Sequence, residues 1–113
     1  MKTPPKKTCV SCPVAQASTL IGDMWVLLIT RELLTGPKRF CELQNALVAD
    51  EGKRPINTRT LTQRLKMLEQ SDIIIREEFE HEMPPKVEYS LTKKGQALSK
   101  IIDQIRVYGK RYF

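Results

Sequence analysis

The chain has 113 residues, of which 41% are hydrophobic, so it can supply one modest core and has no room for a second folded domain. Nineteen Lys and Arg residues against thirteen Asp and Glu residues give a net charge of +6, which favours an anionic partner. No apolar run approaches the roughly 20 residues that cross a bilayer, and no apolar stretch follows the basic N-terminus as in a secretory signal. We therefore expect a cytoplasmic protein with no membrane partner.

The first residues differ in composition from the rest of the chain. Residues 1–8 carry two prolines and three lysines but only one apolar side chain. We therefore expect residues 1–11 to form a flexible basic arm and residues 12–113 to form the folded domain. Pro13 suits the first turn of a helix, where its missing N–H needs no partner, and Gly22 is expected to end that helix.

Three further helices are predicted in series. The segment from Met24 to Thr35 is apolar on nearly every side, which is typical of a helix at the centre of a core, and Gly36 is its expected cap. The next helix spans about Arg39 to Val48, and the one after it runs from Thr58 to Gln70, with Asn57 as its N-cap. Two helices joined by a turn in this way form a helix-turn-helix.

After residue 72 the apolar pattern changes from helical to extended. The sequences IIIREEF and VEYSL predict two strands, joined by a turn from His81 to Lys86 that contains two prolines. Thr92 is the expected N-cap of one last helix. The order of elements predicts a mainly α winged helix-turn-helix (α+β) with a two-stranded wing.

The helix from Thr58 to Gln70 has a basic face. At about 100° per residue, Leu65 and Leu68 lie within about 40° of Leu61, so the three leucines would be buried on the side opposite to Arg59, Gln63 and Lys66. Arg and Gln can make bidentate contacts to guanine and adenine in the major groove, so double-stranded DNA is the expected partner. The alternative is that this face is an ordinary solvated surface. The candidate DNA-binding residues of the helix and the hairpin are Thr58, Arg59, Thr60, Gln63, Arg64, Lys66, Arg76 and Lys86.

Four stretches carry a resemblance to a known family: CPV at 12–14, IGDMWVLLITRELLTGPKRFCEL at 21–43, TRTLTQRLKMLE at 58–69 and PPKVEYSLTKKG at 84–95. In this order and near this spacing they closely resemble the HxlR-type family of bacterial winged-helix regulators. The resemblance implies a homodimer, a recognition helix at TRTLTQRL, a wing at the hairpin, and an N-terminal cysteine that in some members responds to oxidants or reactive carbonyls. The chain departs from the family pattern at Asp23 and Met24, where Gly-Lys is common, after CPV, where an acidic residue is usual, and in its longer connection over residues 48–57.

The predicted wing is acidic for a DNA-binding element. Four glutamates crowd its first strand and turn, which leaves Arg76 and Lys86 as its suitably basic residues. Carboxylates at the tip would repel phosphate, so we expect the wing to contribute less to DNA binding than the helix does.

The cysteines indicate that the protein could be controlled by oxidation of a thiol. Cys12 lies at a predicted helix start, where unpaired N–H groups and the helix dipole would stabilise a thiolate, and Cys9 completes a CxxC spacing that could form a disulfide on oxidation. Cys12 and Cys9 are therefore redox-sensing candidates, with an unreactive, partly buried thiol as the alternative. Cys41 is expected to be a partly buried structural residue. An oxidant or small-molecule effector would act near Cys12 or in a pocket lined by Trp25 and the dimer helices.

Two functions of other classes are compatible with the sequence. One is a winged-helix module used for protein contacts, with the acidic hairpin and the basic helix as docking surfaces. The other is a CxxC thiol oxidoreductase, but the strand that should precede its motif is missing. A Cys3His zinc site is available by number, yet the spacing lacks a second paired knuckle. We expect no metal, no cofactor and no enzymatic activity.

The last helix carries an apolar stripe wider than a small core is expected to cover, which indicates a second copy of the chain as partner. The first and last helices would then be dimerisation helices that place two recognition helices about 34 Å apart on a pseudo-palindromic site. The alternative is that the stripe closes the core of a single chain. The candidate dimer residues are Leu20, Leu98, Ile101, Ile102, Ile105 and Tyr108.

Overall fold

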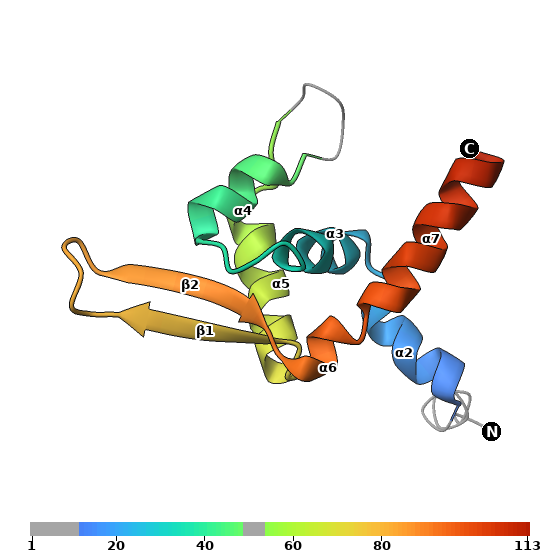
Figure 1. Cartoon of the computed structure of the whole chain (residues 1–113), viewed down its shortest axis with the longest axis horizontal. Helices are drawn as coiled ribbons and strands as arrows, with labels where there is room; N and C mark the ends of the chain where they lie inside the picture. The colour runs from blue at the N-terminus through green and yellow to red at the C-terminus, as the bar shows by residue number, and fades with distance from the viewer. Residues whose placement is uncertain (1–11, 49–53) are drawn as a thin grey trace.

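The computed structural model describes residues 12–48 and 54–113, so the predicted arm and Cys9 lie outside the described residues. Figure 1 shows the hairpin at one end of the molecule and the first and last helices extending from the other end. The elements, in chain order, are α2 (Pro13–Ile21), α3 (Met24–Leu33), α4 (Phe40–Ala46), α5 (Thr58–Gln70), β1 (Ile74–Phe79), β2 (Lys86–Leu91), α6 (Lys93–Gln96) and α7 (Ser99–Tyr112).

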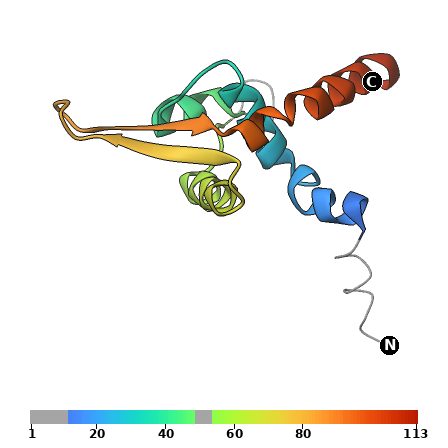
Figure 2. The same ribbon diagram turned by 60° about the horizontal axis from the view of Figure 1, so that its bottom comes forward.

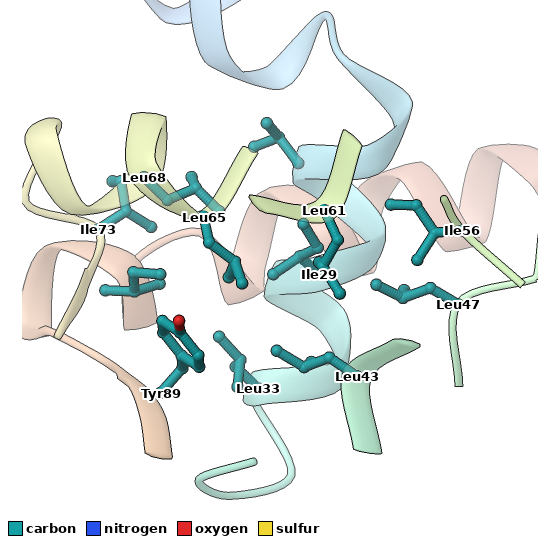
Figure 3. Close-up of a cluster of buried hydrophobic side chains, with 12 residues drawn as sticks. Ile29, Leu33, Leu43, Leu47, Ile56, Leu61, Leu65, Leu68, Ile73 and Tyr89 are labelled. Carbon is teal, nitrogen blue, oxygen red and sulfur yellow. The ribbon is translucent and has the colours of Figure 1, made fainter. Parts of the chain in front are cut away.

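Helix α3 lies at the centre of the core, as its apolar sequence predicted. Its Val26, Ile29 and Leu33 side chains are buried. Figure 3 shows Ile29 and Leu33 among buried side chains from α4, α5 and β2. The helix ends at Leu33, two residues earlier than predicted, and Gly36 follows with a φ of 137°, a conformation that residues with a Cβ rarely adopt.

Helices α4 and α5 form the helix-turn-helix. Helix α5 has the bounds that the sequence predicted, and the Asn57 side chain caps it by accepting hydrogen bonds from the N–H groups of Arg59 (2.8 Å) and Thr60 (3.2 Å). The three leucines of α5 are buried against α3 and the rest of the core. The predicted inner face of this helix is therefore confirmed.

Strands β1 and β2 form an antiparallel hairpin, in which Ile74 lies opposite Leu91 and Phe79 lies opposite Lys86. Lys38, just before α4, pairs with Tyr89 of β2 through two backbone hydrogen bonds of 3.0 and 2.8 Å. The hairpin is thereby attached to the entrance of the helix-turn-helix (Figure 2). The predicted winged helix-turn-helix with a two-stranded wing is confirmed.

The C-terminal region differs from the single helix that was predicted. Thr92 caps a helix as expected, since its Oγ1 accepts the N–H of Gly95 (3.0 Å), but this helix, α6, ends at Gln96. Gly95 is buried so closely against the Ile73 carbonyl that a Cβ would not fit. The Leu98 N–H then bonds to the carbonyl three residues back, and this tighter turn separates α6 from α7.

Among the described residues, no single helix has both the length and the apolar character needed to cross a membrane. Helices α2 and α3 taken together pass on length and composition alone, but they meet at an angle of 75°.

Candidate nucleic-acid interface

The outer face of α5 presents three polar side chains to solvent. Arg59, Gln63 and Lys66 are exposed, on the side opposite the buried leucines. Within residues 12–48 and 54–113, the side chains of these three residues form no hydrogen bond or ion pair with another residue. Their donors and acceptors are therefore available to a ligand.

The N-terminus of α5 is held by α4. Gln44 Nε2 donates a hydrogen bond to Thr58 Oγ1 (2.8 Å) and a second one to the Ile56 carbonyl oxygen (3.2 Å). Because the Thr58 oxygen accepts from Gln44, its own O–H proton can be donated outward. Gln44 was not among the predicted residues, since no sequence pattern connects a residue of one helix to the first turn of the next.

Arg64 differs from the other predicted DNA-binding residues of α5. Its Nε donates to Asp23 Oδ2 at 2.8 Å, and both side chains are about three-quarters buried, with 29% and 26% exposed. Arg64 lies about 60° from Leu61 around the helix, at the border of the buried face. This angle is the sequence signal that could have separated Arg64 from Arg59, Gln63 and Lys66, which lie about 140° to 160° from Leu61. Of the other two predicted residues of the helix, Thr58 is exposed and Thr60 is half-buried.

Both predicted basic residues of the wing are paired with carboxylates. Arg76 Nη1 donates to Glu78 Oε2 at 2.6 Å, and the hydrogen bonds that the guanidinium makes to Glu78 and Tyr89 raise the pKa of Arg76 above its ordinary value. Lys86 lies 3.4 Å from Glu88 and 3.7 Å from Glu82. The wing thus offers phosphate two cations whose charges are already compensated.

Cys12 and Cys41 are both exposed free thiols. Cys12 is the N-cap residue of α2, directly before Pro13, as predicted. The expectation that Cys41 is partly buried is wrong, because Leu43, about 200° further round α4, takes the side of this short helix that faces the core.

The predicted dimer residues fall into two groups. Ile102 is buried, and Leu20 and Leu98 pack against the core of the same chain, whereas the side chains of the remaining three residues project into solvent. These three, with their exposed fractions, are Ile101 (37%), Ile105 (46%) and Tyr108 (60%). Part of the stripe thus closes the core of the single chain, and the rest has no covering within the described residues.

An apolar groove of about 340 Å³ lies between α3 and α7. Trp25 packs against the core of the single chain and does not line this groove. The expected pocket between Trp25 and the dimer helices stays a prediction. The groove is lined by Met24, Leu27, Leu28, Arg31, Ile102, Ile105 and Arg106.

A helix-turn-helix with an exposed polar face on its second helix, beside a two-stranded wing, defines a winged-helix DNA-binding protein. Residues 20–113 match the family model described as HxlR-like helix-turn-helix, so the chain belongs to this family of transcriptional regulators. The resemblance carried by the four sequence stretches is confirmed.

The chain is also similar in sequence and in structure to individual known proteins. An uncharacterised HTH-type transcriptional regulator of Synechocystis sp. is 37% identical over 91 residues, which are 80% of this chain and 62% of that protein. A protein from Porphyromonas gingivalis W83 that is assigned to the MarR family of transcriptional regulators superposes with a TM-score of 0.80 at 31% identity, over 91% of this chain and 94% of its own. The redox regulator HypR in its oxidized form superposes with a TM-score of 0.77 at 35% identity, over 90% of this chain and 98% of its own. These relatives are named as regulators, not as enzymes.

Proposed function

We propose that the protein binds a pseudo-palindromic promoter site as a homodimer and that α5 reads the bases in the major groove. The observation that carries this proposal is the outer face of α5. Arg59, Gln63 and Lys66 are exposed without partners among the described residues, while buried leucines and the Gln44–Thr58 hydrogen bond fix the helix from behind. A rigid helix with available polar side chains is what base recognition requires.

Each residue has a role that its chemistry supports. The Arg59 guanidinium is suited to the O6 and N7 atoms of guanine, and the Gln63 amide to the N6 and N7 atoms of adenine. Lys66 supplies a phosphate contact, and Thr58 and Thr60 contact phosphate or a thymine methyl group at the entrance of the groove. In the wing, Arg76 and Lys86 make weaker contacts, because carboxylates already neutralise them.

A second copy of the chain is the proposed partner of α2 and α7. Helix α2 buries none of its own residues, and Ile101, Ile105 and Tyr108 form an exposed row along α7. This row continues into the apolar groove through Ile105, which lines it. Apolar faces of this kind lower their free energy by pairing, and a two-fold axis through α7 would place two copies of α5 on one side of the dimer.

Thiol chemistry at Cys12 is the proposed control. Cys12 is exposed at the start of α2, a proposed dimerisation helix, and the similar protein HypR is named as a redox regulator. A peroxide would oxidise the Cys12 thiolate to a sulfenic acid, with the O–O bond broken and water released, and this change would alter the position of α2 and with it the fit to DNA. Because the proposed target is a promoter, we place the protein in the cytoplasm.

The direct test is selection of bound sequences from a random DNA pool, followed by titration at several salt concentrations. A defined two-fold motif and a steep salt slope support the regulator. No enrichment of any sequence would overturn it and favour the winged-helix module for protein contacts. Lys110→Ala, at the far end of α7, is the charge-matched control for substitutions on α5.

The dimer has its own test in sedimentation. Ile105→Glu should convert a dimer to a monomer without unfolding it, because 46% of this side chain is already exposed in the single chain. Val107→Glu, two residues along α7 and 56% exposed, points to the other side of the helix and should leave the dimer intact. A wild-type monomer at micromolar concentration would refute the arrangement.

Cys12→Ser tests the redox control. Oxidant should release DNA from the wild-type protein and from Cys41→Ser, but not from Cys12→Ser. Release from Cys12→Ser equal to that from the wild type would overturn the role of Cys12.

A further inference from the structure

The Asp23–Arg64 ion pair joins two parts of the molecule that are distant in sequence. Arg64 belongs to α5, one turn after Thr60 and next to Gln63, on the helix that faces DNA. Asp23 is the second of the two residues between α2 and α3, where the chain bends by 75°. Of the six ion pairs between described residues, this is the one that spans 41 positions, while each of the others joins residues at most four positions apart.

The Asp23 carboxylate divides its two oxygens between two elements. Oδ1 accepts the N–H of Val26 (3.1 Å) and caps α3, while Oδ2 accepts the Nε–H of Arg64 (2.8 Å). The Asp23 N–H in turn donates to the Leu20 carbonyl oxygen (3.2 Å) at the end of α2. One residue is therefore bonded to α2, α3 and α5 together.

Helix α2 has few attachments to the rest of the described chain apart from the junction around Asp23. A Cβ on Gly22 would lie 2.6 Å from the Ser18 carbonyl oxygen, so the chain turns there with the backbone of α2 in close contact. Helix α2 buries no residue, and it is otherwise attached to the core mainly through Leu20. A directional bond at the junction therefore has a large effect on where α2 points relative to α5.

We propose that Asp23 and Arg64 are positioning residues that fix the angle between α2 and the DNA-reading helix and thereby set the spacing of the two half-sites that the protein accepts. This inference rests on the proposed function, in which α2 and α7 form the dimer and α5 reads the bases. A change at the start of α2, where Cys12 lies, would reach α5 through this ion pair.

Three substitutions isolate the pair. Asp23→Asn keeps an N-cap for α3, since Asn caps helices as well as Asp does, but removes the charge. Arg64→Met keeps the length and much of the apolar stem of the side chain and removes the donor. Glu32→Gln is the matched control, because it neutralises the carboxylate of an ion pair between neighbouring residues of α3.

The first measurement is the distance between α2 and α5 within one chain. Spin labels at Ala17→Cys and Gln70→Cys, in a chain whose native cysteines are serine, report this distance by pulsed electron resonance, with unlabelled protein added so that each labelled chain is seen alone. We expect a narrow distribution for the otherwise unchanged chain and for Glu32→Gln, and a broader or shifted one for Asp23→Asn and Arg64→Met. Unchanged distributions in both variants would overturn the proposal.

The second measurement is binding to paired half-sites whose spacing varies by single base pairs. The wild type should prefer one spacing, and Asp23→Asn and Arg64→Met should reduce that preference about threefold to tenfold while the bases preferred within each half-site stay the same. The Asp23→Asn/Arg64→Met double variant should lose no more of this spacing preference than either single variant does, because both substitutions break the same ion pair. An unaltered spacing preference would overturn the role in DNA binding.

The two measurements separate this inference from the proposed function. If the wild type selects no DNA, the proposed function fails, and the label distances still decide whether the ion pair fixes α2 relative to α5. If the wild type selects a paired site and the variants keep its spacing preference, the proposed function stands and this inference fails.

Discussion

Helix α5 and the wing are both predicted to approach DNA, and both carry basic residues, but their charges lie in different surroundings. On α5, the cations Arg59 and Lys66 have no carboxylate partner among the described residues. In the wing, each basic side chain lies within 4 Å of at least one glutamate. A count of basic residues would treat the two regions as similar, whereas the pairing shows that only α5 offers phosphate and bases uncompensated charge.

The two regions also differ in rigidity at the point of contact. Helix α5 is fixed by buried leucines, the Asn57 cap and Gln44. The end of the hairpin extends away from the core, as Figures 1 and 2 show, and residues 80–85 are all exposed. Specific recognition requires a rigid support, so base specificity is expected from α5.

The largest expected effect comes from the inner face of α5. Leu65→Ala should lower the free energy of unfolding by about 2–5 kcal/mol, because a buried leucine is lost and a cavity is left. Phe79→Ala, at the half-buried end of β1, should lower the free energy of unfolding by clearly less than Leu65→Ala does. Denaturant unfolding compares the two, and equal losses would mean that the wing is as firmly packed as the helix.

Arg59→Ala and Gln63→Ala test the outer face of the same helix. Each should cost about 1–3 kcal/mol at the base that it contacts and relax the preference at that position, with stability nearly unchanged. Competition binding with single-base variants of the selected site measures this. A uniform loss over all sequences would show that these residues contact phosphate and do not read bases.

Asn57→Ala tests the cap that begins α5. The loss of its two hydrogen bonds should lower the free energy of unfolding by about 1 kcal/mol, whereas Asn57→Ser, which keeps an acceptor, should have little effect. Equal stability of the alanine and serine variants would show that the cap does not support the helix.

The smallest effects separate the lysines of the two regions. Lys66→Ala should lower the slope of binding against salt by about 1, because one phosphate contact is lost. Lys86→Ala should change affinity by less than about 0.5 kcal/mol, because Glu82 and Glu88 already compensate its charge. A larger loss for Lys86 than for Lys66 would reverse the comparison.

The fold could be predicted from the sequence wherever a local pattern decides the structure. The bounds and cap of α5 and the two strands follow from leucine spacing, Asn57 and β-branched runs, which act within a few residues. The break between α6 and α7 could not be predicted in this way, because the tight turn that ends in Leu98 has no glycine or proline at residues 97 and 98 to mark it.

In the candidate DNA-binding site, too, the features set by local sequence could be predicted and the long-range contacts could not. The exposed positions of Arg59, Gln63 and Lys66 follow from the helical period alone. The pairing of Arg64 with Asp23 spans 41 positions and joins the border of the buried face of α5 to the N-cap of α3, so no local pattern indicates it. Long-range polar contacts of this kind are where sequence reasoning on this chain fails.

The most direct test of the account is an NMR titration of the protein with its selected DNA site. The account predicts the largest shifts and line broadening in the amide resonances of residues 57–66, with small changes at the wing tip, residues 80–85. Large changes at the wing tip with little change over residues 57–66 would contradict it.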